Sequence, residues 1–399
     1  MRFFPATPFD ASRRSFFEGA FAFLAVAAPL SASFASLKAA EPGRSPAVRP
    51  SVSGRLFDDG SVRVYVDGQL FAGYVPDAQG TPIVWPLRTP SGALATRAWP
   101  MIDQIDVDAQ TDAAMKTIYQ NAQIGERGGQ KDHPHHRSLW FNHGAVKGGD
   151  FWALTDSKIR QTETVSFDCD GKTVVLVTKN RWFNAKLDRD ICEDVRTLRF
   201  GVLPSEQVAG KNVRYIDFSI KITALEDDVL FGDTKEGTFG VRLPSPTALT
   251  AKKSNPSWGG RILDDVGRKD GETWGKRSAW VDYSGPAARF LEGDELAREL
   301  ARGDKAADFP LTTIGVAVLN GQESWAFPSW RHVRDYGLFA TNPFGQRDFE
   351  PKNADADGSK TLNRGETLRF DYRVLLHDGD LTADDLDAAF KAYSQEIKR

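Results

Sequence analysis

Apolar and polar positions alternate repeatedly along the chain from residue 61 onward. Residues 61–66 (SVRVYV) alternate, an Asp-Gly pair follows at 67–68, and residues 69–74 (QLFAGY) form a second run. An Asp-Gly pair between two such runs is the strongest short signal for a β-hairpin. The same pattern recurs at residues 164–177, around an Asp-Gly pair at 170–171. These segments predict antiparallel strands joined by tight turns.

More strand patterns follow through to the C-terminal region. Alternating or apolar runs lie at residues 213–222, 238–243, 314–319, 337–341 and 367–376. Many short strands with few helices are typical of a β-sandwich. We therefore predict an all-β fold, one large two-sheet antiparallel β-sandwich with a C-terminal helix, rather than two separate domains.

Helical patterns are confined to two segments. Residues 294–302 (DELARELAR) predict a short surface helix within a charged insertion. Near the C-terminus, Thr382 can cap a helix whose apolar residues recur every three or four positions from Leu386 to Ile397. This spacing places them on one helical face, so we expect that helix to pack on the edge or face of a sheet.

The start of the chain carries an export pattern. Paired arginines precede Phe-Phe at residues 12–17, an apolar stretch covers 20–30, and small residues follow at 31–35. A basic segment, a short apolar core and a small-residue cleavage site together indicate a signal peptide. The paired arginines make it the twin-arginine type.

This pattern divides the chain into three parts. We predict a twin-arginine signal peptide over residues 1–39, a Pro/Gly/Ser-rich linker over 40–54, and a single β-sandwich domain over 55–399. The apolar stretch of the signal has about 11 residues, whereas a bilayer span needs about 20. No later stretch is apolar enough to span. We expect a periplasmic or extracellular protein with no stable membrane span in its mature form.

The composition of the chain limits the classes of partner that it can bind. The net charge is −3 without any basic block, which makes nucleic acid an improbable partner. The ten tryptophans suit a β core in most cases, and a sugar-stacking surface in others. Cys169 and Cys192 could form a disulfide after export or remain as buried thiols.

Four of the six histidines lie within eleven residues, in the stretch DHPHHRSLWFNHG at 132–144. Histidine suits proton transfer near neutral pH and is the commonest metal ligand. One interpretation is a divalent metal site formed by His133, His135 and His143. Another is a metal-free site in which His135 or His136 is a general acid or base and Arg137 orients an oxygen-rich substrate. A hydrogen-bonded structural turn is the third interpretation.

Two further stretches combine charges with strand patterns. In WRHVRDYGLFATNPFG at 330–345, an extended backbone would place His332 and Arg334 on one face, and Arg331, Val333 and Asp335 on the other. Burying such charges beside an apolar strand costs free energy, unless the charges form ion pairs or line a cleft.

The other stretch, GDTKEGTFGVR at 232–242, crowds charged residues into a loop before a strand. Its Glu236 is a candidate acid or base, and Lys235 could bind a substrate oxygen. A solvated charged turn explains the same spacing.

The three stretches, with Ser278–Gly285 (SAWVDYSG), resemble the PmoA-like family of exported bacterial proteins. That family is often labelled "methane oxygenase PmoA" and is best described as a domain of unknown function. The membrane methane monooxygenase subunit has several spanning helices, and this chain has none after its signal, so we reject methane oxidation. The family is more remotely similar to the galactose-mutarotase-like supersandwich fold, which hosts sugar mutarotases, epimerases and polysaccharide lyases.

The resemblance implies a sugar site with a histidine, a carboxylate and an arginine on one sheet. We expect proton transfer by His135, His136, His332, Glu236 and Asp335. We expect substrate contacts from Arg137, Arg334, Trp140, Asn142, Trp152, Lys235 and Trp330. The hypothesis is an exported carbohydrate-active protein of mutarotase, epimerase or lyase type, with a small-molecule or oligosaccharide ligand. The alternatives are a non-catalytic carbohydrate-binding module and a metal-dependent oxidoreductase.

Overall fold

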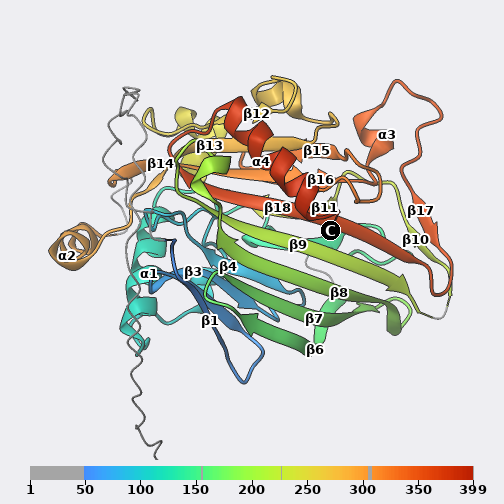
Figure 1. Cartoon of the computed structure of the whole chain (residues 1–399), viewed down its shortest axis with the longest axis horizontal. Coiled ribbons are helices and arrows are strands. Elements are labelled where there is room, and N and C mark those ends of the chain that lie inside the picture. Colours follow the sequence, from blue (N-terminus) through green and yellow to red (C-terminus); the bar gives the residue numbers. More distant parts are fainter. Residues whose placement is uncertain (1–48, 154–155, 226, 304–307, 399) are drawn as a thin grey trace, which may run out of the picture. The chain divides into compact units, whose positions relative to one another are not determined.

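Two antiparallel sheets of eight strands each lie face to face in the sandwich (Figure 1). The computed structural model describes residues 49–398 except 154–155, 226 and 304–307. The predicted signal peptide lies outside the described residues, and residues Arg49–Arg399 group together by their internal contacts. The predicted all-β, two-sheet antiparallel sandwich with a C-terminal helix is confirmed.

The first sheet contains, in spatial order, β1 (Val52–Leu56), β2 (Val62–Val66), β3 (Gln69–Val75), β4 (Ile83–Leu87), β5 (Leu139–His143), β11 (Gly237–Arg242), β16 (Leu338–Asn342) and β15 (Trp330–Val333). The second sheet contains β12 (Arg261–Asp264), β13 (Trp280–Ala288), β14 (Leu311–Asn320), β18 (Thr367–Asp378), β9 (Val213–Ala224), β8 (Arg189–Val202), β7 (Thr173–Asn184) and β6 (Lys158–Cys169). A separate pair joins β10 (Val229–Phe231) to β17 (Lys360–Leu362).

The helices are α1 (Ala113–Gly125), α2 (Gly293–Ala301), α3 (Gln346–Phe349) and α4 (Ala383–Glu396). Short 3-10 helices lie at Met101–Gln104, Ser205–Gln207, Ser245–Thr247, Leu249–Lys253 and Asp270–Thr273. No helix within the described ranges is long and apolar enough to cross a membrane.

Both predicted Asp-Gly turns form hairpins. Strands β2 and β3 pair across Asp67 and Gly68, whose φ angles of 49° and 77° suit a two-residue turn of the type that matches strand twist. Strands β6 and β7 pair across Asp170, whose side chain accepts hydrogen bonds from the backbone of Lys172 and Thr173. One boundary differs, since β1 begins at Val52 inside the predicted linker and pairs with β2.

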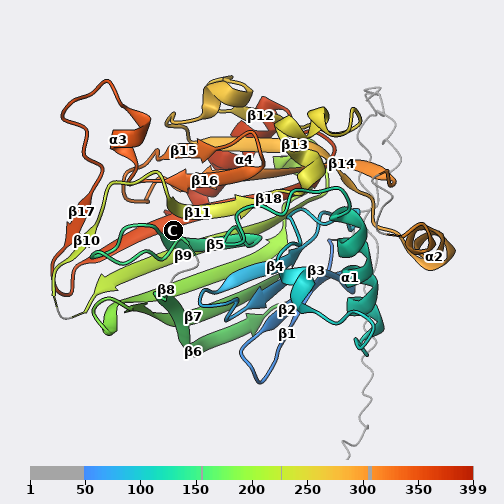
Figure 2. The same cartoon turned by 180° about the vertical axis from the view of Figure 1, so that it is seen from behind.

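The core lies between the two sheets because alternate residues of each strand point inward. From the first sheet, Phe141, Phe239 and Phe339 contribute, and Phe218 and Phe370 face them from the second sheet. Alternate residues of β5, β11, β16 and β15 therefore lie on the outer face of the first sheet, which Figure 2 shows in front.

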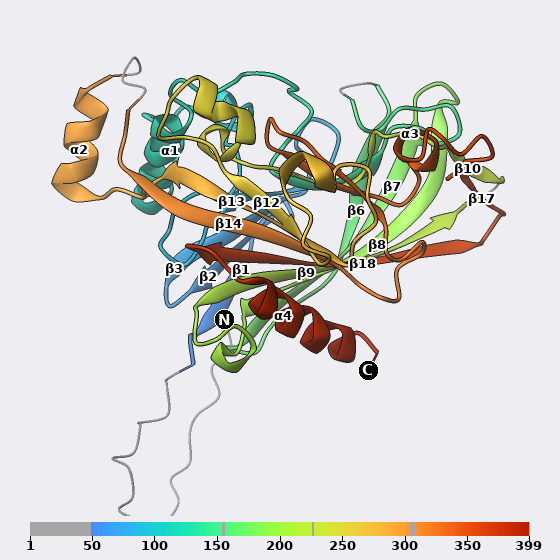
Figure 3. The same cartoon turned by 90° about the horizontal axis from the view of Figure 1, so that it is seen from above.

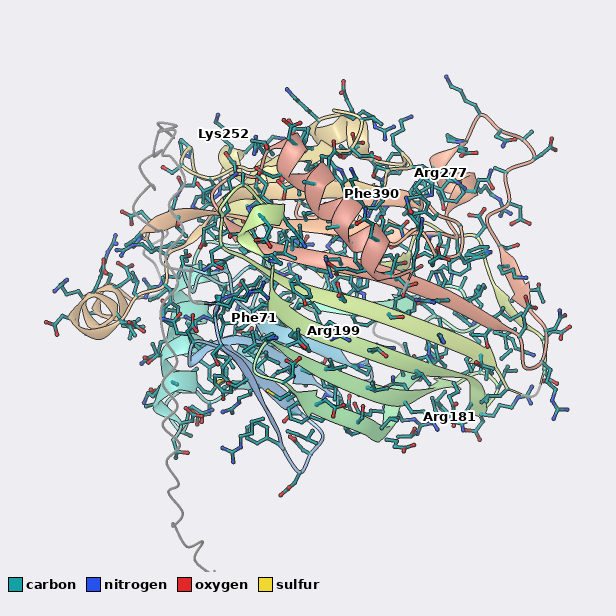
Figure 4. All side chains as sticks on the ribbon, viewed as in Figure 1. Phe71, Arg181, Arg199, Lys252, Arg277 and Phe390 are labelled. Atoms are coloured by element: carbon teal, nitrogen blue, oxygen red, sulfur yellow. The ribbon has the colours of Figure 1, made fainter. Side chains whose placement is uncertain are left out.

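The predicted C-terminal helix covers the outer face of the second sheet (Figure 3). Thr382 forms a capping box with Asp385 at the start of α4. Leu386 and Tyr393 of this helix pack against Trp280 and Leu375 of the sheet. Away from α4 the same face carries the partly exposed Arg181 and the exposed Arg199 (Figure 4).

Helix α1 was not predicted, and it limits where a site can lie. Asp112 caps the helix through the backbone N–H groups of Ala114 and Met115. The apolar face of α1 packs on the outer face of the first sheet, where Ile118 and Tyr119 join a cluster with Trp85 of β4. The same buried cluster reaches Trp140 of β5 and Leu338 and Ala340 of β16, so the helix lies at one side of the face that these strands form.

Candidate functional site

The three charged stretches meet on the outer face of the first sheet. Strand β5 pairs with β11, β11 with β16, and β16 with β15. The register aligns Trp140, Gly240, Ala340 and His332 in one row across these four strands. Stretches almost 200 residues apart in sequence therefore contribute to one surface, as the predicted single site requires.

The floor of this surface depends on a glycine. A Cβ at Gly240 would collide with the ring of Trp140, so the missing side chain lets that indole lie across β11. The Trp140 ring also contacts Trp152, with 5.2 Å between ring centroids. Both rings are almost fully buried.

The histidine loop is held by a buried ionic network. His133 and His136 close a tight turn, since the backbone N–H of His136 donates to the carbonyl of His133. Oδ1 of Asp132 lies 2.7 Å from Arg97 Nη1 and 2.6 Å from Arg242 Nη2. Both guanidinium groups are buried. The two arginines share the Asp132 carboxylate, which fixes the loop on β11, and the charge of Glu126 also acts on both of them.

Ring stacking connects the loop to the third stretch. The ring of Tyr336 is parallel to that of His133 at 5.1 Å, and the His133 ring is parallel to that of His136 at 4.8 Å. The guanidinium of Arg242 lies 4.9 Å from the Tyr336 ring centroid. All three stretches are therefore in direct contact.

The hydrogen bonds of His136 determine which ring nitrogen carries its proton. Arg242 Nη1 lies 3.2 Å from His136 Nδ1, and a guanidinium can only donate. Nδ1 is therefore the acceptor, and the hydrogen of the neutral ring is on Nε2. Burial, together with the nearby His135 and Arg242, lowers the pKa of His136 far below its ordinary value.

His332 is arranged in the same way on β15. Nε1 of Trp274 donates to His332 Nδ1 at 3.2 Å, and an indole N–H is a donor only. The neutral His332 ring therefore also carries its hydrogen on Nε2. Burial, then the positive charges of Arg334 and Lys235, lowers its pKa to about 3. Two buried, neutral imidazoles thus present N–H groups from opposite ends of the site.

Acidic groups and a third histidine lie at the rim. Burial raises the pKa of Glu236, although the Lys235 ammonium 3.6 Å away opposes this. Burial lowers the pKa of the half-buried His135 to about 4, with His133 as the next cause. The negative charge of Asp150 raises the pKa of both Glu236 and His135. Two titratable groups with shifted pKa values therefore share one neighbour, as is common at functional sites.

Residues 61–391 match a family described as a family of unknown function, DUF6807. This chain belongs to the DUF6807 family. The match does not carry the PmoA-like label, which stays a prediction from the motifs. No curated protein matches the sequence.

Three solved structures illustrate what the fold of this DUF6807 protein is similar to. A polysaccharide lyase is 10% identical over 86% of this chain and 35% of its own, with a TM-score of 0.27. A GH36 alpha-galactosidase from Geobacillus stearothermophilus, in complex with raffinose, is 10% identical over 78% and 40%, with a TM-score of 0.32. A Klebsiella pneumoniae protein described as an aldose 1-epimerase is 8% identical over 86% and 87%, with a TM-score of 0.33.

The chain spans 35% and 40% of the length of the first two of these structures. Because all three TM-scores are below 0.5, we draw no argument about the site from them.

The predicted proton-transfer residues fall into two groups in this DUF6807 protein. His135, His136, His332 and Glu236 lie on or around the outer face described above. Asp335 lies on the turn between β15 and β16, where it is exposed and its backbone carbonyl accepts from the N–H of Thr250. The structure shows no contact of the Asp335 carboxylate with the histidines.

The three predicted cationic contacts also differ. Arg137 is buried and donates to the carbonyl of Ala78 and the side chain of Gln79, so it braces the loop between β3 and β4. Lys235 pairs with Glu236. Arg334 lies on the outer face, two residues beyond His332, with its guanidinium 5.5 Å from the Tyr336 ring centroid.

The predicted stacking residues are covered by protein. Trp330 is 2% exposed, with the guanidinium of Arg277 3.8 Å from its ring centroid and its Nε1 donating to Glu350 at 3.1 Å. Trp140 and Trp152 are buried as well. In this structure none of the three offers an open ring face to a pyranose.

Among the described residues, several buried polar atoms of the site have no protein partner. They include Nε1 of Trp140, Nε1 of Trp152, Oδ1 of Asn142 and Nε of Arg97 and Arg242. Asn142 pairs with Thr238 of β11, two residues along each strand from the Trp140–Gly240 pair and on the same face. Buried polar groups are nearly always hydrogen-bonded, so these atoms point to water or to a ligand.

The predicted metal set is not brought together. His143 lies on the core side of β5, where Nε2 donates to the carbonyl of Gly232 at 2.8 Å and its ring contacts Phe344. His133 and His135 lie on the loop over the opposite face. Strand alternation separates them from His143, and within the described residues no group of three His, Cys, Asp or Glu side chains is arranged to hold a metal.

Several residues of the site were not among the candidates. Asp132, Arg242 and Tyr336 lie inside the quoted stretches, so their position beside the histidines was a usable signal. Arg97 and Trp274 are far from those stretches in sequence, and no local pattern identifies them. Cys169 is exposed and Cys192 is buried, and both are free thiols outside the site.

Proposed function

We propose that this protein is an exported carbohydrate-active enzyme that transfers a proton at or next to an anomeric or carbonyl carbon of a sugar. The reaction would be of mutarotase, epimerase or lyase type, on a small-molecule or oligosaccharide ligand outside the cytoplasm. The observation that carries the proposal is the direct contact of the three charged stretches on one face, with His136 and His332 fixed as N–H donors.

Glu236 is the proposed proton-transfer group. Its raised pKa brings the carboxyl closer to neutral pH, which suits a group that must take and return a proton. In the proposed step the carboxylate takes the proton from a carbon next to a carbonyl group. The C–H electron pair then forms the double bond of an enolate. Return of the proton to the other side gives the epimer, and loss of a β-oxygen substituent gives elimination.

His136 and His332 take a role other than the exchange of protons that the sequence suggested. With Nδ1 occupied as an acceptor and a lowered pKa, each ring is a neutral donor through Nε2. Fixed donors of this kind stabilise an oxygen that gains negative charge during the reaction. His135 has no such restraint and remains a candidate for a second proton transfer.

We favour catalysis over a non-catalytic carbohydrate-binding module. A module that binds sugars by stacking needs an open aromatic face, and Trp140, Trp152 and Trp330 are all buried. A metal-dependent oxidoreductase is less favoured because the proposed ligand histidines lie on opposite faces of β5.

The test is a screen of tag-free protein against oligosaccharides and keto-sugars, followed by proton NMR in D₂O. Wild type should exchange or transfer a proton on at least one sugar, and Glu236→Gln should lower the rate by about 10²–10⁴. Glu163→Gln is the matched control, because Glu163 on β6 also pairs with a lysine, at 3.5 Å, but on the second sheet. Equal rates in Glu236→Gln and wild type would remove Glu236 from the mechanism. No conversion of any sugar would contradict catalysis.

A further inference from the structure

Apart from the carboxylates at its rim, Glu236 and Asp150, the site has more unpaired hydrogen-bond donors than unpaired acceptors among the described residues. His136 and His332 each carry a hydrogen on Nε2, and the structure shows no protein acceptor for either. Nε1 of Trp140 and Nε1 of Trp152 are buried donors without a partner. On the described strands β5, β11, β15 and β16, Oδ1 of Asn142 is the buried acceptor without a partner.

This imbalance discriminates between ligand groups. A sugar hydroxyl both donates and accepts, so a neutral sugar would leave its own donors facing N–H groups. A carboxylate only accepts, through two oxygens with about four lone-pair positions. A donor-rich floor therefore matches a carboxylate better than it matches a set of hydroxyls.

An unpaired cation lies beside one of these donors. Arg334 forms no ion pair with a carboxylate among the described residues, unlike Arg97 and Arg242, which share Asp132. It lies on the same face as His332, two residues along the chain, and its charge acts on that imidazole. A guanidinium without a carboxylate partner is suited to bidentate binding of a ligand's carboxylate.

We propose that the site binds a uronate, a sugar that carries a carboxylate, with the carboxylate held between the Arg334 guanidinium and Nε2–H of His332. This inference rests on the proposed function, which makes the ligand a sugar. In this arrangement the carbon next to the carboxylate loses the proton. The carboxylate oxygens that gain negative charge in that step are held by Arg334 and by Nε2–H of His332. Glu236, at the rim, is the group left to take that proton.

The test measures binding of four probes by isothermal titration calorimetry at low ionic strength. The methyl glycosides of glucuronate and galacturonate are the charged probes, and those of glucose and galactose are the neutral ones. We expect at least tenfold tighter binding of one charged probe than of its neutral counterpart. Raising the salt concentration should weaken only the charged probe, since the preference is ionic.

Arg334→Gln should abolish this preference, so that each charged probe binds no more tightly than its neutral counterpart. Arg199→Gln is the matched control: Arg199 also forms no ion pair within hydrogen-bonding distance among the described residues, and it lies on β8 of the second sheet (Figure 4). Equal affinity for charged and neutral probes in wild type, or a preference that survives Arg334→Gln, would overturn the inference.

The two proposals fail in different ways. Conversion of a neutral sugar that depends on Glu236, without any preference for a uronate, supports the enzyme and refutes the uronate. Tight uronate binding without any conversion supports the uronate and refutes the enzyme. No binding of any probe at millimolar concentration contradicts the uronate inference.

Discussion

The outer face of each sheet contains a buried histidine, but the hydrogen bonds of the two rings differ. On the second sheet, beside the start of α4, His377 Nδ1 lies 2.9 Å from the carbonyl of Gly379, and Nε2 lies 3.0 Å from Asp282. On the first sheet, His332 has a partner for Nδ1 only, the indole of Trp274. Both imidazoles are almost fully buried.

The difference separates a structural histidine from a candidate functional one. Both ring nitrogens of His377 have a protein acceptor, so neither is available to bind a ligand. In His136 and His332, Nδ1 accepts a hydrogen bond from the protein, and the N–H of Nε2 has no partner among the described residues. Burial alone does not mark a site, whereas burial with an unused donor does.

The largest expected effect is on stability, at His377. Replacement by leucine, His377→Leu, leaves the buried Asp282 carboxylate without its partner, which should lower the free energy of unfolding by about 3–5 kcal/mol. Urea unfolding at pH 7 measures this. A loss below about 1 kcal/mol would show that the His377–Asp282 pair is not structural. The distinction between His377 and the histidines of the first sheet would then fail.

A second prediction concerns pH and the buried His143. Burial lowers its pKa to about 4, below the unfolded value near 6.5, so the fold favours the neutral ring. The contribution of the neutral His143 ring to the free energy of unfolding is complete above pH 6.5. As the pH falls toward 4, about 3 kcal/mol of this stability is lost. Relative to His143→Gln, wild type should lose that much stability between pH 6.5 and 4 in urea titrations. Parallel pH profiles of the two proteins would refute the shift.

A smaller effect on stability is expected at His332. His332→Leu removes one hydrogen bond from Trp274, which is partly exposed and can bond to water instead, so the cost should be about 1 kcal/mol. The same change should remove most ligand binding in the calorimetric test above. If stability instead falls as far as in His377→Leu, His332 is structural and the distinction between the two faces is lost.

The smallest effect is expected on removal of metals. Since the described residues hold no three-ligand group, dialysis against EDTA should leave the melting temperature of tag-free protein unchanged within about 1 °C. A shift of several degrees that zinc or manganese reverses would point to a metal that these residues hold after rearrangement.

The fold was largely predictable because its signals are local. Asp-Gly turns and alternating runs identified the hairpins, and Thr382 identified the start of α4. Helix α1 was missed although Asp112 and its apolar positions are local signals too. The start of β1 was missed because Val52 lies among prolines and glycines, and only pairing with β2 makes it a strand.

The site was predictable only as far as its residues are close in sequence. The alternation of β15 correctly placed His332 and Arg334 on one face and Arg331 on the other. The proton positions of His136 and His332 depend on Arg242 and Trp274, which lie 106 and 58 residues away. No local pattern specifies such partners. The metal set was wrongly assembled because strand alternation puts His143 on the core side.

The most direct measurement is a long-range ¹⁵N–¹H correlation spectrum of the histidine side chains at pH 7. We expect neutral rings with hydrogen on Nε2 for His136 and His332, and the signals of both should move when a uronate is added and binds. The signals of His143 and His377 should not move. A ring of His332 that carries its hydrogen on Nδ1, or that is doubly protonated at pH 7, would contradict the proposed role of His332 as a neutral donor.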